Sequence, residues 1–582
     1  MSADQTKALQ WDIETDVVCV GAGAGGMSAA LTASIEGLEA LVVEKTPFVG
    51  GSTAVSGGAV WIPNNPQSAA LGHHDSIGKA KLYLDRIVGN WASDEMKIAF
   101  LEAGPKMVDY FEQHTEVKLV ARAYSPDYYP NVEGASLGGR SMDPAPFDGR
   151  GLGQAFGLLR PPLKEFVVLG GMMVTMTDVY HLLNVTKSFA SWAHGMKLVM
   201  RYAVDRLRFP RGTRLVLGNA LAGRLFKSVL DRKIPVWVST PARRLIAEDG
   251  RIAGLVVAKD GRDYAIKARR GVVLATGGFA SDPTFRKDFL PHPTGPWSMA
   301  PEGNTGDGLR LGQEVGAQPQ RNNASNAFFT PISILEKSDG ETIKFPHLVW
   351  DRAKPGLIAV NDAAQRFVNE STSYHEFGRA MYESHKAVPS IPAYLICDRA
   401  FLRKWGLGLA LPGGRPFRHL VNAGYLVEAT TVGELAQKLA LDGVALASTI
   451  ARFNELAHEG EDCDFGKGGT AYNRYLGDPA VTSRNPCLGT IERPPFYAVR
   501  VYPGDLGTAA GFVTDRHARV LDREGQPIPG LYACGNDMNS VMGGTYPGPG
   551  ITLGPALTFG YLAGCDLAGK TKTRGRAELT AG

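Results

Sequence analysis

Short apolar runs and helical patterns alternate along the first part of the chain. Residues 16–20 form a β-branched apolar run, which is typical of a buried strand in a parallel sheet. An alanine-rich helical pattern covers residues 27–36, and residues 40–43 form a second apolar run. Strand, helix and strand in this order predict a βαβ unit, so we expect an α/β fold with a parallel sheet and covering helices.

The loop between the first strand and the helix carries a glycine pattern. Gly21, Gly23 and Gly26 satisfy G-x-G-x-x-G, Gly25 adds a further glycine, and Glu44 follows the second strand 18 residues after Gly26. Glycines allow a tight turn and let a pyrophosphate reach the helix N-terminus, and an acid at this distance binds ribose hydroxyls. The combination predicts a Rossmann-like dinucleotide site.

Residues 150–217 look like an insertion with basic, amphipathic character. The apolar run 166–176 has 11 residues, well short of the ~20 needed to span a bilayer. The region 178–214 mixes aromatic and aliphatic side chains with seven Lys or Arg residues, opposed by Asp178 and Asp205. This pattern predicts one of two things: peripheral contact of residues 160–210 with an anionic membrane surface, or a hairpin that packs on the domain or forms an oligomer interface. The oligomeric state stays open.

The composition argues against nucleic-acid binding and against a structural metal site. The chain of 582 residues exceeds one domain, and 62 basic against 58 acidic residues leave no excess charge for nucleic-acid binding. The six cysteines are scattered without a C-x-x-C pair, and no histidine cluster has zinc spacing, so we expect reduced thiols and no metal. The polar first 16 residues contain no apolar signal core, and we expect a cytoplasmic protein.

The segment 543–554 concentrates glycine and proline around one phenol, Tyr546. Its glycines let the backbone approach a ligand closely, while two prolines stiffen it. An apolar helical pattern begins at Ile551, which puts Gly550 near a helix N-terminus with unpaired N–H groups. The Tyr546 hydroxyl and the Gly550 N–H could therefore converge on one carbonyl oxygen and stabilise an oxyanion. An ordinary glycine/proline turn is the alternative.

Two other stretches supply candidate phenols. Residues 122–130 form a proline-bounded loop with Tyr124, Tyr128 and Tyr129, which suits either the wall of an apolar pocket or surface packing. Tyr374 lies in a stretch that follows a strand-like run at 357–360.

Three further segments carry a resemblance to a family of flavoproteins. Residues 50–58 are rich in glycine and hydroxyl side chains, residues 271–278 join a strand to a glycine turn, and residues 530–536 read as a returning strand. With the dinucleotide motif, this order resembles the FAD-dependent enzymes of the fumarate reductase/succinate dehydrogenase flavoprotein superfamily over nearly the whole chain. The resemblance implies FAD. We expect it to be bound non-covalently, because no histidine lies around Ser52, where relatives with a covalent flavin carry one.

The same resemblance implies a split architecture. A Rossmann-like FAD-binding domain would combine residues 1–290, including the insertion, with residues 498–582, and an α+β catalytic domain would occupy residues 291–497. The residues expected to contact FAD are Gly21, Gly23, Gly25, Gly26, Glu44, Lys45, Gly51, Ser52, Thr53, Ser56, Gly57, Gly58, Ala275, Thr276, Gly277, Asp307, Gly535, Asn536 and Leu553.

Four stretches resemble the 3-ketosteroid 1-dehydrogenases, namely residues 127–129, 373–381, 504–508 and 546–550. That resemblance implies removal of hydrogens from carbons 1 and 2 of a 3-oxosteroid ring A. It assigns the carbonyl-binding pair to Tyr546 and Gly550, the catalytic base to Tyr374 and a supporting phenol to Tyr128. Tyr374 would take the proton from carbon 2, and the hydride from carbon 1 would pass to flavin N5.

The assigned base needs help from its surroundings. A tyrosine with an unperturbed pKa near ~10 is a poor base at neutral pH, so Tyr374 requires a neighbour that stabilises its phenolate, and Tyr128 is the candidate.

Other members of the superfamily are alternatives. A fumarate reductase-like reduction of a small unsaturated acid would use an arginine as proton donor, but Lys467 stands at that place, and a lysine does not replace an arginine fork. A 3-ketosteroid 4-(5α)-dehydrogenase is a closer alternative, and a non-catalytic flavin-binding subunit is a third. The enzyme would also need an external electron acceptor. A quinone fits if the insertion contacts the membrane, and the sequence has no second nucleotide motif that would favour NAD(P)H.

Overall fold

The computed structural model describes residues 10–164, 167–349, 351–481 and 484–570. Its largest sheet has eight strands in the order β10-β2-β1-β13-β12-β11, with β21 beside the end of β13 and β20 on β21. The pairs that join β10, β2, β1, β13 and β21 are parallel, which confirms the predicted α/β class. The strand bounds are β1 Ile13–Val20, β2 Ala40–Val43, β10 Val236–Trp237, β11 Ala242–Glu248, β12 Arg251–Lys259, β13 Arg262–Leu274, β20 Arg519–Leu521 and β21 Pro527–Ala533.

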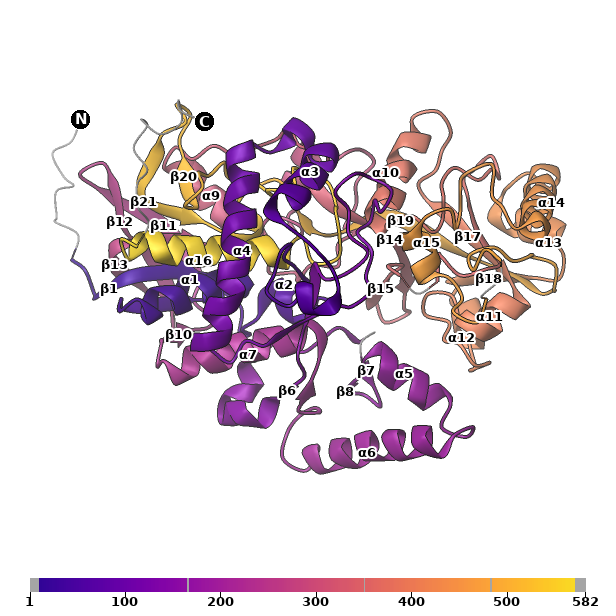
Figure 1. Cartoon of the computed structure of the whole chain (residues 1–582), viewed down its shortest axis with the longest axis horizontal. Coiled ribbons are helices and arrows are strands. Elements are labelled where there is room, and N and C mark those ends of the chain that lie inside the picture. The colour runs from indigo at the N-terminus through magenta and orange to yellow at the C-terminus, as the bar shows by residue number, and fades with distance from the viewer. Residues whose placement is uncertain (1–9, 165–166, 350, 482–483, 571–582) are drawn as a thin grey trace.

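Helices from both ends of the chain cover this sheet. Helix α1 (Ala24–Ile35) follows β1, and α16 (Leu553–Leu567) lies beside it although more than 500 residues separate the two in sequence (Figure 1). A Cβ at Gly560 would lie 2.6 Å from the carbonyl oxygen of Gly25, so only glycine allows this close approach of the helices. Helices α4 (Asp94–His114) and α7 (Leu217–Asp231) pack on the same layer.

A second sheet of six strands forms the other side of the molecule. Its order is β15-β14-β19-β17-β16 with β18 on β19, and every pair is antiparallel. The strands are β14 Ala327–Glu336, β15 Thr342–Pro346, β16 Leu357–Val360, β17 Ala393–Asp398, β18 Leu426–Ala429 and β19 Phe496–Thr508. We keep the division of the chain at residues 290 and 498 as a proposal; β19 runs through the second of these boundaries.

Helices flank the second sheet. Helix α10 packs on β14 and β19, and α13 and α14 pack on one another. The helices are α10 Tyr374–His385, α11 Arg399–Trp405, α12 Arg418–Asn422, α13 Val432–Leu439, α14 Gly443–Glu459 and α15 Ala471–Leu476.

The basic segment forms a separate lobe, below the two sheets in Figure 1. It contains the hairpin β7 (Val167–Val168) and β8 (Met172–Met173), then α5 (Met176–Leu183) and α6 (Phe189–Asp205). Met172, Val174 and Leu198 form its small core. Strand β9 (Arg214–Leu215) returns the chain by pairing with β6 (Phe147–Asp148). Among the described helices none is long and apolar enough to cross a membrane.

Smaller elements complete the framework. The remaining bounds are α2 Gly51–Ala54, β3 Val60–Trp61, η1 Ala69–Leu71, α3 Ile77–Ile87, η2 Gly89–Trp91, β4 Leu119–Ala121, β5 Ser141–Pro144, η3 Gly149–Leu158, α8 Pro283–Phe289, α9 Asp307–Glu314 and η5 Gly535–Asp537.

Candidate active site

A cavity of about 350 Å³ is lined by segments from the first sheet, the second sheet and the loop before α16. One part is lined by the glycine-rich turns after β1 and β2, and another by the phenols of Tyr128, Tyr374 and Tyr546. Apolar side chains, including Met299, Leu348 and Leu506, also line it. The dinucleotide turn and the phenols therefore line one continuous cavity.

The turn after β1 has the geometry that phosphate binding needs. Gly21 has a φ of +112°, and a Cβ there would lie 2.2 Å from the carbonyl oxygen of Ala275, so no other residue fits. Gly23 is the N-cap of α1 and has no side chain of its own to cap the helix, the Thr53 hydroxyl accepts only from the Ala24 N–H, and a Cβ at Gly23 would meet open space. The unpaired N–H groups at this end of α1 thus face the cavity and suit a pyrophosphate.

Glu44 is positioned at the end of β2 by the same turn. Its Oε2 accepts a hydrogen bond from the Ala22 N–H at 3.0 Å, and its Oε1 accepts from the Thr46 N–H and hydroxyl, both at 2.9 Å. The carboxylate is nearly buried but lines the cavity, as an acid that binds ribose hydroxyls must. Lys45 beside it forms a 2.6 Å ion pair with Asp307.

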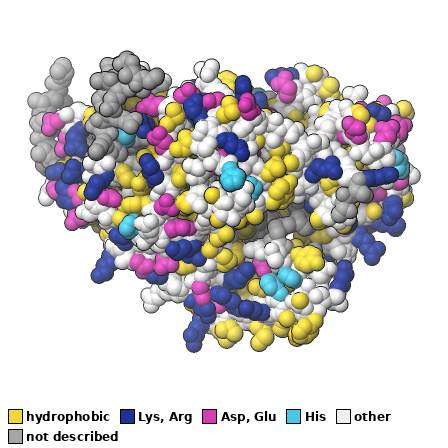
Figure 2. Space-filling view, in the orientation of Figure 1, with side chains coloured by type: hydrophobic (Ala, Val, Ile, Leu, Met, Phe, Trp, Pro, Cys, Tyr) yellow, Lys and Arg dark blue, Asp and Glu magenta, His cyan; other side chains and the backbone are white. Residues whose placement is uncertain are grey.

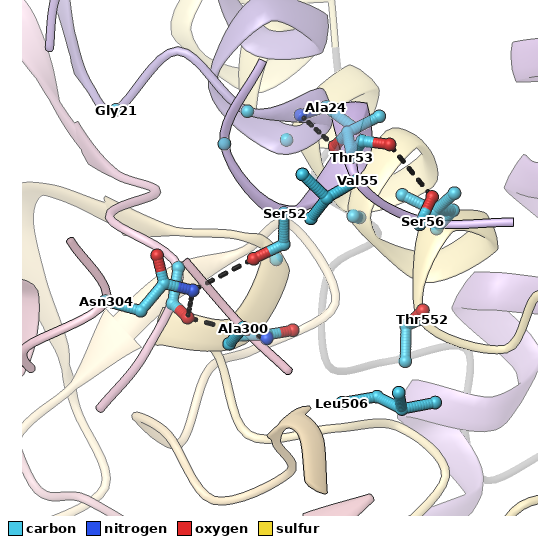
Figure 3. Close-up of a pocket in the computed structure, with 18 of the residues that line it drawn as sticks. Gly21, Ala24, Ser52, Thr53, Val55, Ser56, Ala300, Asn304, Leu506 and Thr552 are labelled. Carbon is cyan, nitrogen blue, oxygen red and sulfur yellow. Dashed lines mark hydrogen bonds between the residues drawn. The ribbon is translucent and has the colours of Figure 1, made fainter. Parts of the chain in front are cut away.

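The second glycine-rich stretch is tied to both neighbouring segments. The Thr53 hydroxyl accepts from the Ala24 N–H at 3.0 Å, which joins α2 to the start of α1. Asn304 donates from Nδ2 to Ser52 Oγ and to the Gly277 carbonyl, both at 2.9 Å. Figure 3 shows Ser52 and Asn304 pointing toward one another across the cavity wall. The motifs did not point to Asn304, because its role comes from three segments that meet only in the fold.

The structure brings nearly all of the expected FAD residues to this cavity. Gly26 does not line it; a Cβ there would lie 2.0 Å from the Gly21 carbonyl oxygen, so Gly26 allows α1 to pack against the turn. Direct FAD contact by each of the others stays a prediction. The expected residues that line the cavity are Gly21, Gly23, Gly25, Glu44, Lys45, Gly51, Ser52, Thr53, Ser56, Gly57, Gly58, Ala275, Thr276, Gly277, Asp307, Gly535, Asn536 and Leu553.

Three phenols from distant parts of the chain form a buried cluster. The Tyr128 hydroxyl donates to the Tyr374 hydroxyl at 3.0 Å. The rings of Tyr128 and Tyr546 stack with centroids 5.4 Å apart, and the Tyr374 ring meets Tyr546 edge-on at 5.1 Å. Each side chain is less than 9% exposed. The residues to which the family resemblance assigns the roles of base, supporting phenol and carbonyl donor therefore lie together.

Burial controls the protonation of this cluster. It raises the pKa of Tyr546 to about 12 and the pKa values of Tyr374 and Tyr128 well above the usual value, because a phenolate is poorly solvated here. Tyr546 is therefore a hydrogen-bond donor at neutral pH. Tyr374 is protonated for most of the time, so the predicted role as base would depend on its small phenolate fraction.

His375 follows Tyr374, and burial shifts its pKa in the opposite direction. Its Nδ1 accepts a hydrogen bond from the Phe329 N–H at 3.1 Å, and its ring packs against Phe329 and Tyr546. Burial lowers its pKa to about 4, because the imidazolium is poorly solvated. His375 is thus a neutral packing residue, a state that its place in the stretch 373–381 did not indicate.

The Tyr546–Gly550 loop is held by hydrogen bonds from α3 and from the aromatic loop. The Tyr83 hydroxyl and the Tyr128 N–H both donate to the Pro547 carbonyl, at 2.7 and 2.9 Å. Gly550 has a φ of +105°, its carbonyl accepts from the Trp61 N–H at 3.1 Å, and it lines the cavity. No described residue accepts a hydrogen bond from the Gly550 N–H, which leaves this donor for a ligand.

Buried charges fix the aromatic loop in turn. Arg140 forms ion pairs with Asp127 at 2.8 Å and Asp75 at 2.7 Å, and Asp127 also accepts from Trp61 Nε1 at 2.9 Å. All four side chains are almost fully buried. This network sets the position of Tyr128, the next residue after Asp127.

Lys467 lies away from the cavity. Its ammonium donates to the Leu357 carbonyl at 2.5 Å and lies 3.7 Å from Glu370, in a buried cluster beside β16 of the second sheet. Burial lowers its pKa, and Glu370 opposes the shift. The position that carries a proton-donating arginine in the fumarate-type resemblance therefore does not line this cavity.

Comparison with known proteins agrees with this geometry. The model of the FAD binding domain family matches residues 16–553. The chain is 38% identical to a 3-oxosteroid 1-dehydrogenase of Mycolicibacterium smegmatis, over 95% of this chain and 97% of the relative. It is 36% identical to a 4-oxocyclohex-2-ene-1-carboxylate 5-dehydrogenase of Sinomonas cyclohexanicum, over 96% and 94%. The crystal structure of 3-ketosteroid delta1-dehydrogenase from Sterolibacterium denitrificans with 1,4-androstadiene-3,17-dione matches with a TM-score of 0.89 and 39% identity, over 96% of this chain and 100% of that chain.

Proposed function

Since the chain belongs to the FAD-binding oxidoreductase family that includes the 3-oxosteroid 1-dehydrogenases, we propose that it is an FAD-dependent enzyme that introduces the 1,2 double bond into ring A of 3-oxosteroids. The observation that carries this proposal is the buried cluster of Tyr128, Tyr374 and Tyr546, at a cavity that Gly550 and the dinucleotide turn also line. Bound FAD supplies a hydride acceptor at N5 of its ring.

The residues of the chain bind the substrate carbonyl, remove the proton and orient the substrate. The Tyr546 hydroxyl and the Gly550 N–H hold the substrate carbonyl oxygen and stabilise the enolate that forms when the neighbouring carbon loses a proton. Tyr374 takes that proton from carbon 2, and Tyr128 stabilises the charge on Tyr374 through their 3.0 Å hydrogen bond. The apolar walls hold carbon 1 in the orientation for hydride loss and exclude water.

The charges of the cavity favour a neutral substrate. The cations among its described lining residues are Lys45, Arg122 and Arg160. Lys45 pairs with Asp307, and Arg122 donates two hydrogen bonds to Asp143 at 2.6 and 2.8 Å. Arg160 contacts Thr46, next to Glu44 on the dinucleotide side. Among these lining residues, no unpaired cation therefore lies beside the phenols to bind a carboxylate, although a relative acts on a one-ring oxo acid.

A comparison of a neutral steroid with a one-ring oxo acid tests the preference for a neutral substrate. We expect kcat/KM for androst-4-ene-3,17-dione to exceed that for 4-oxocyclohexanecarboxylate by at least about 10²-fold, since an unpaired carboxylate in the apolar half of the cavity costs several kcal/mol. Steady-state assays with an artificial electron acceptor measure both values. A higher kcat/KM for the one-ring acid would assign the enzyme to the other substrate class.

The pH dependence follows from the raised pKa of Tyr374. Because the base must be a phenolate and its pKa lies above the assay range, we expect kcat/KM to rise with pH between about pH 6 and 9, by up to tenfold per unit. Tyr546, with a pKa of about 12, stays protonated over this range, and His375, with a pKa of about 4, stays neutral. Steady-state profiles check this, and a flat profile would contradict a phenolate base.

We further propose that α6 binds the surface of an anionic membrane. Its outward apolar side chains include Phe189, Met200 and, just after the helix, Leu207, which are 81%, 62% and 83% exposed. Lys197 is exposed beside them, whereas the helix's one acidic residue, Asp205, is buried and accepts from the Thr213 hydroxyl at 2.8 Å. Figure 2 shows the hydrophobic side chains along the lower edge of the molecule with Lys and Arg nearby.

Charge and apolarity on one exposed helix fit lipid headgroups and acyl chains together. We propose that the enzyme lies on the cytoplasmic face of the membrane, where a quinone can serve as the external electron acceptor. The alternatives for this surface are a second copy of the chain or a protein partner.

Vesicle binding tests the surface. We expect the protein to co-sediment with vesicles that contain phosphatidylserine more than with phosphatidylcholine vesicles, and the double variant Phe189→Ser, Leu207→Ser to lose about tenfold or more in partitioning. Val444→Ser is the matched control, because Val444 is 82% exposed on α14, in the other domain. Equal partitioning of all variants would contradict the proposal, and loss of a dimer in the double variant would assign the surface to a second copy.

A further inference from the structure

Arg160 is a cavity residue that no motif indicated. It lies two residues after the end of η3, near the start of the basic segment, and both polar groups of its backbone are hydrogen-bonded. Its N–H donates to the Val49 carbonyl at 2.9 Å, and its carbonyl accepts from Asn219 Nδ2 at 2.8 Å. The side chain therefore starts from a rigid position next to the segment that follows β2.

The guanidinium lies beside the dinucleotide acid. Its Nη2 donates to the Thr46 hydroxyl at 3.0 Å, and the same hydroxyl donates to Glu44 at 2.9 Å. The Phe48 ring lies against the guanidinium, and the distance from Arg160 Cζ to the ring centroid is 5.7 Å. Arg160 thus lines the part of the cavity where Glu44 is set to bind a ribose.

The Arg160 guanidinium forms no ion pair with a described carboxylate. No described carboxylate lies within 4.0 Å of its guanidinium, and its Nε is buried without a hydrogen-bond partner. Burial lowers its pKa, and the charge of Glu44 opposes the shift. A partly buried cation with a free donor costs free energy unless a ligand provides an acceptor, preferably an anionic one.

We propose that Arg160 binds the adenosine diphosphate half of FAD, donating from its guanidinium to the ribose–phosphate oxygens. This inference rests on the proposed function only in taking FAD as the cofactor. Arginine suits the role because its planar fork offers several donors and binds phosphate oxygens as a pair. The free Nε and the neighbouring Glu44 would then hold the same half of the cofactor from two sides.

FAD affinity tests the contact. The full-length protein is freed of FAD and reloaded, and its dissociation constant is measured from flavin fluorescence. We expect Arg160→Gln to raise the dissociation constant for FAD by about tenfold or more, as for the loss of a charge-assisted hydrogen bond. Glu44→Ala is the positive control. Arg208→Gln is the matched negative control, since Arg208 is an exposed arginine of the same lobe, and it should stay within about twofold. Unchanged FAD affinity in Arg160→Gln would overturn the proposal.

A second titration locates the contact on the cofactor. ADP carries the proposed contact atoms without the flavin, so Arg160→Gln should weaken ADP binding by the same factor as FAD binding. Weaker FAD binding with unchanged ADP binding would put the contact on the flavin half and overturn the proposal. If Arg160→Gln does not fold, Arg160→Lys keeps the charge but loses the fork, and it should raise both dissociation constants in parallel.

The measured FAD affinity does not depend on whether the enzyme oxidises a steroid, so this test can fail separately from the proposed function. A wild-type protein that binds FAD without oxidising any 3-oxosteroid would contradict the proposed function and leave the Arg160 contact intact. Unchanged FAD affinity in Arg160→Gln would contradict the Arg160 contact and leave the proposed function intact.

Discussion

Replacing Tyr374 by phenylalanine is expected to lower kcat for 1,2-dehydrogenation by about 10²–10⁴-fold, the range for loss of a general base. The substitution removes the hydroxyl that lies 3.0 Å from Tyr128 and leaves a ring of nearly the same shape at the start of α10. Steroid oxidation under steady-state conditions measures the loss. FAD content should not change, because the phenol belongs to the substrate side of the cavity.

A second phenol on the same helix provides the control. Tyr382 is 8% exposed on α10, and its hydroxyl has no hydrogen-bond partner among the described residues. Tyr382→Phe should therefore keep close to full activity while making the same chemical change. Full activity in Tyr374→Phe would remove this residue from the mechanism. A loss of equal size in both variants would point to helix packing rather than to base catalysis.

Replacing Tyr546 by phenylalanine is expected to lower kcat by about 10²–10³-fold, the cost of losing one oxyanion donor. The hydroxyl is a donor at neutral pH because burial raises its pKa to about 12. Its contribution should be larger for the enolate than for the neutral ketone. The loss should therefore fall mainly on kcat, with a smaller change in the dissociation constant of the steroid.

Rapid-mixing kinetics separate these two quantities for Tyr546→Phe. Flavin reduction in a single turnover should slow by the same factor as kcat, while the steroid concentration that gives half the maximal rate changes little. An unchanged rate of flavin reduction would show that the hydroxyl does not stabilise the enolate. A loss confined to steroid affinity would make Tyr546 a binding residue only.

Local patterns predicted the cofactor half of the molecule well. Strand β1, the glycine turn, α1 and Glu44 are consecutive in sequence, so the physical reason for each residue could be stated without the fold. The Gly21 turn illustrates this: the +112° φ and the contact with Ala275 are what the motif requires. The parallel sheet followed from the same short apolar runs.

Local sequence patterns did not predict the residues on the substrate side of the cavity. Tyr128 and Tyr374 are 246 residues apart, and only a family resemblance linked them before the structure brought their hydroxyls to 3.0 Å. Asn304 and Arg160 carried no site pattern, and the neutral state of His375 could not be read from its place in the stretch 373–381, because their surroundings come from segments that meet only in the folded chain. The basic segment was expected to be amphipathic, but its separation into α5 and α6 depends on packing within the lobe.

The most direct test of the central claim is an anaerobic titration of the purified holoenzyme with androst-4-ene-3,17-dione, with analysis of the steroid product. The proposed function predicts that the flavin absorbance bleaches and that the product is the 1,4-diene. Bleaching only by a 5α-reduced 3-oxosteroid, with a 4-ene product, would contradict the 1,2 assignment in favour of the 4-(5α)-dehydrogenase reaction. No bleaching by either steroid would contradict steroid oxidation altogether.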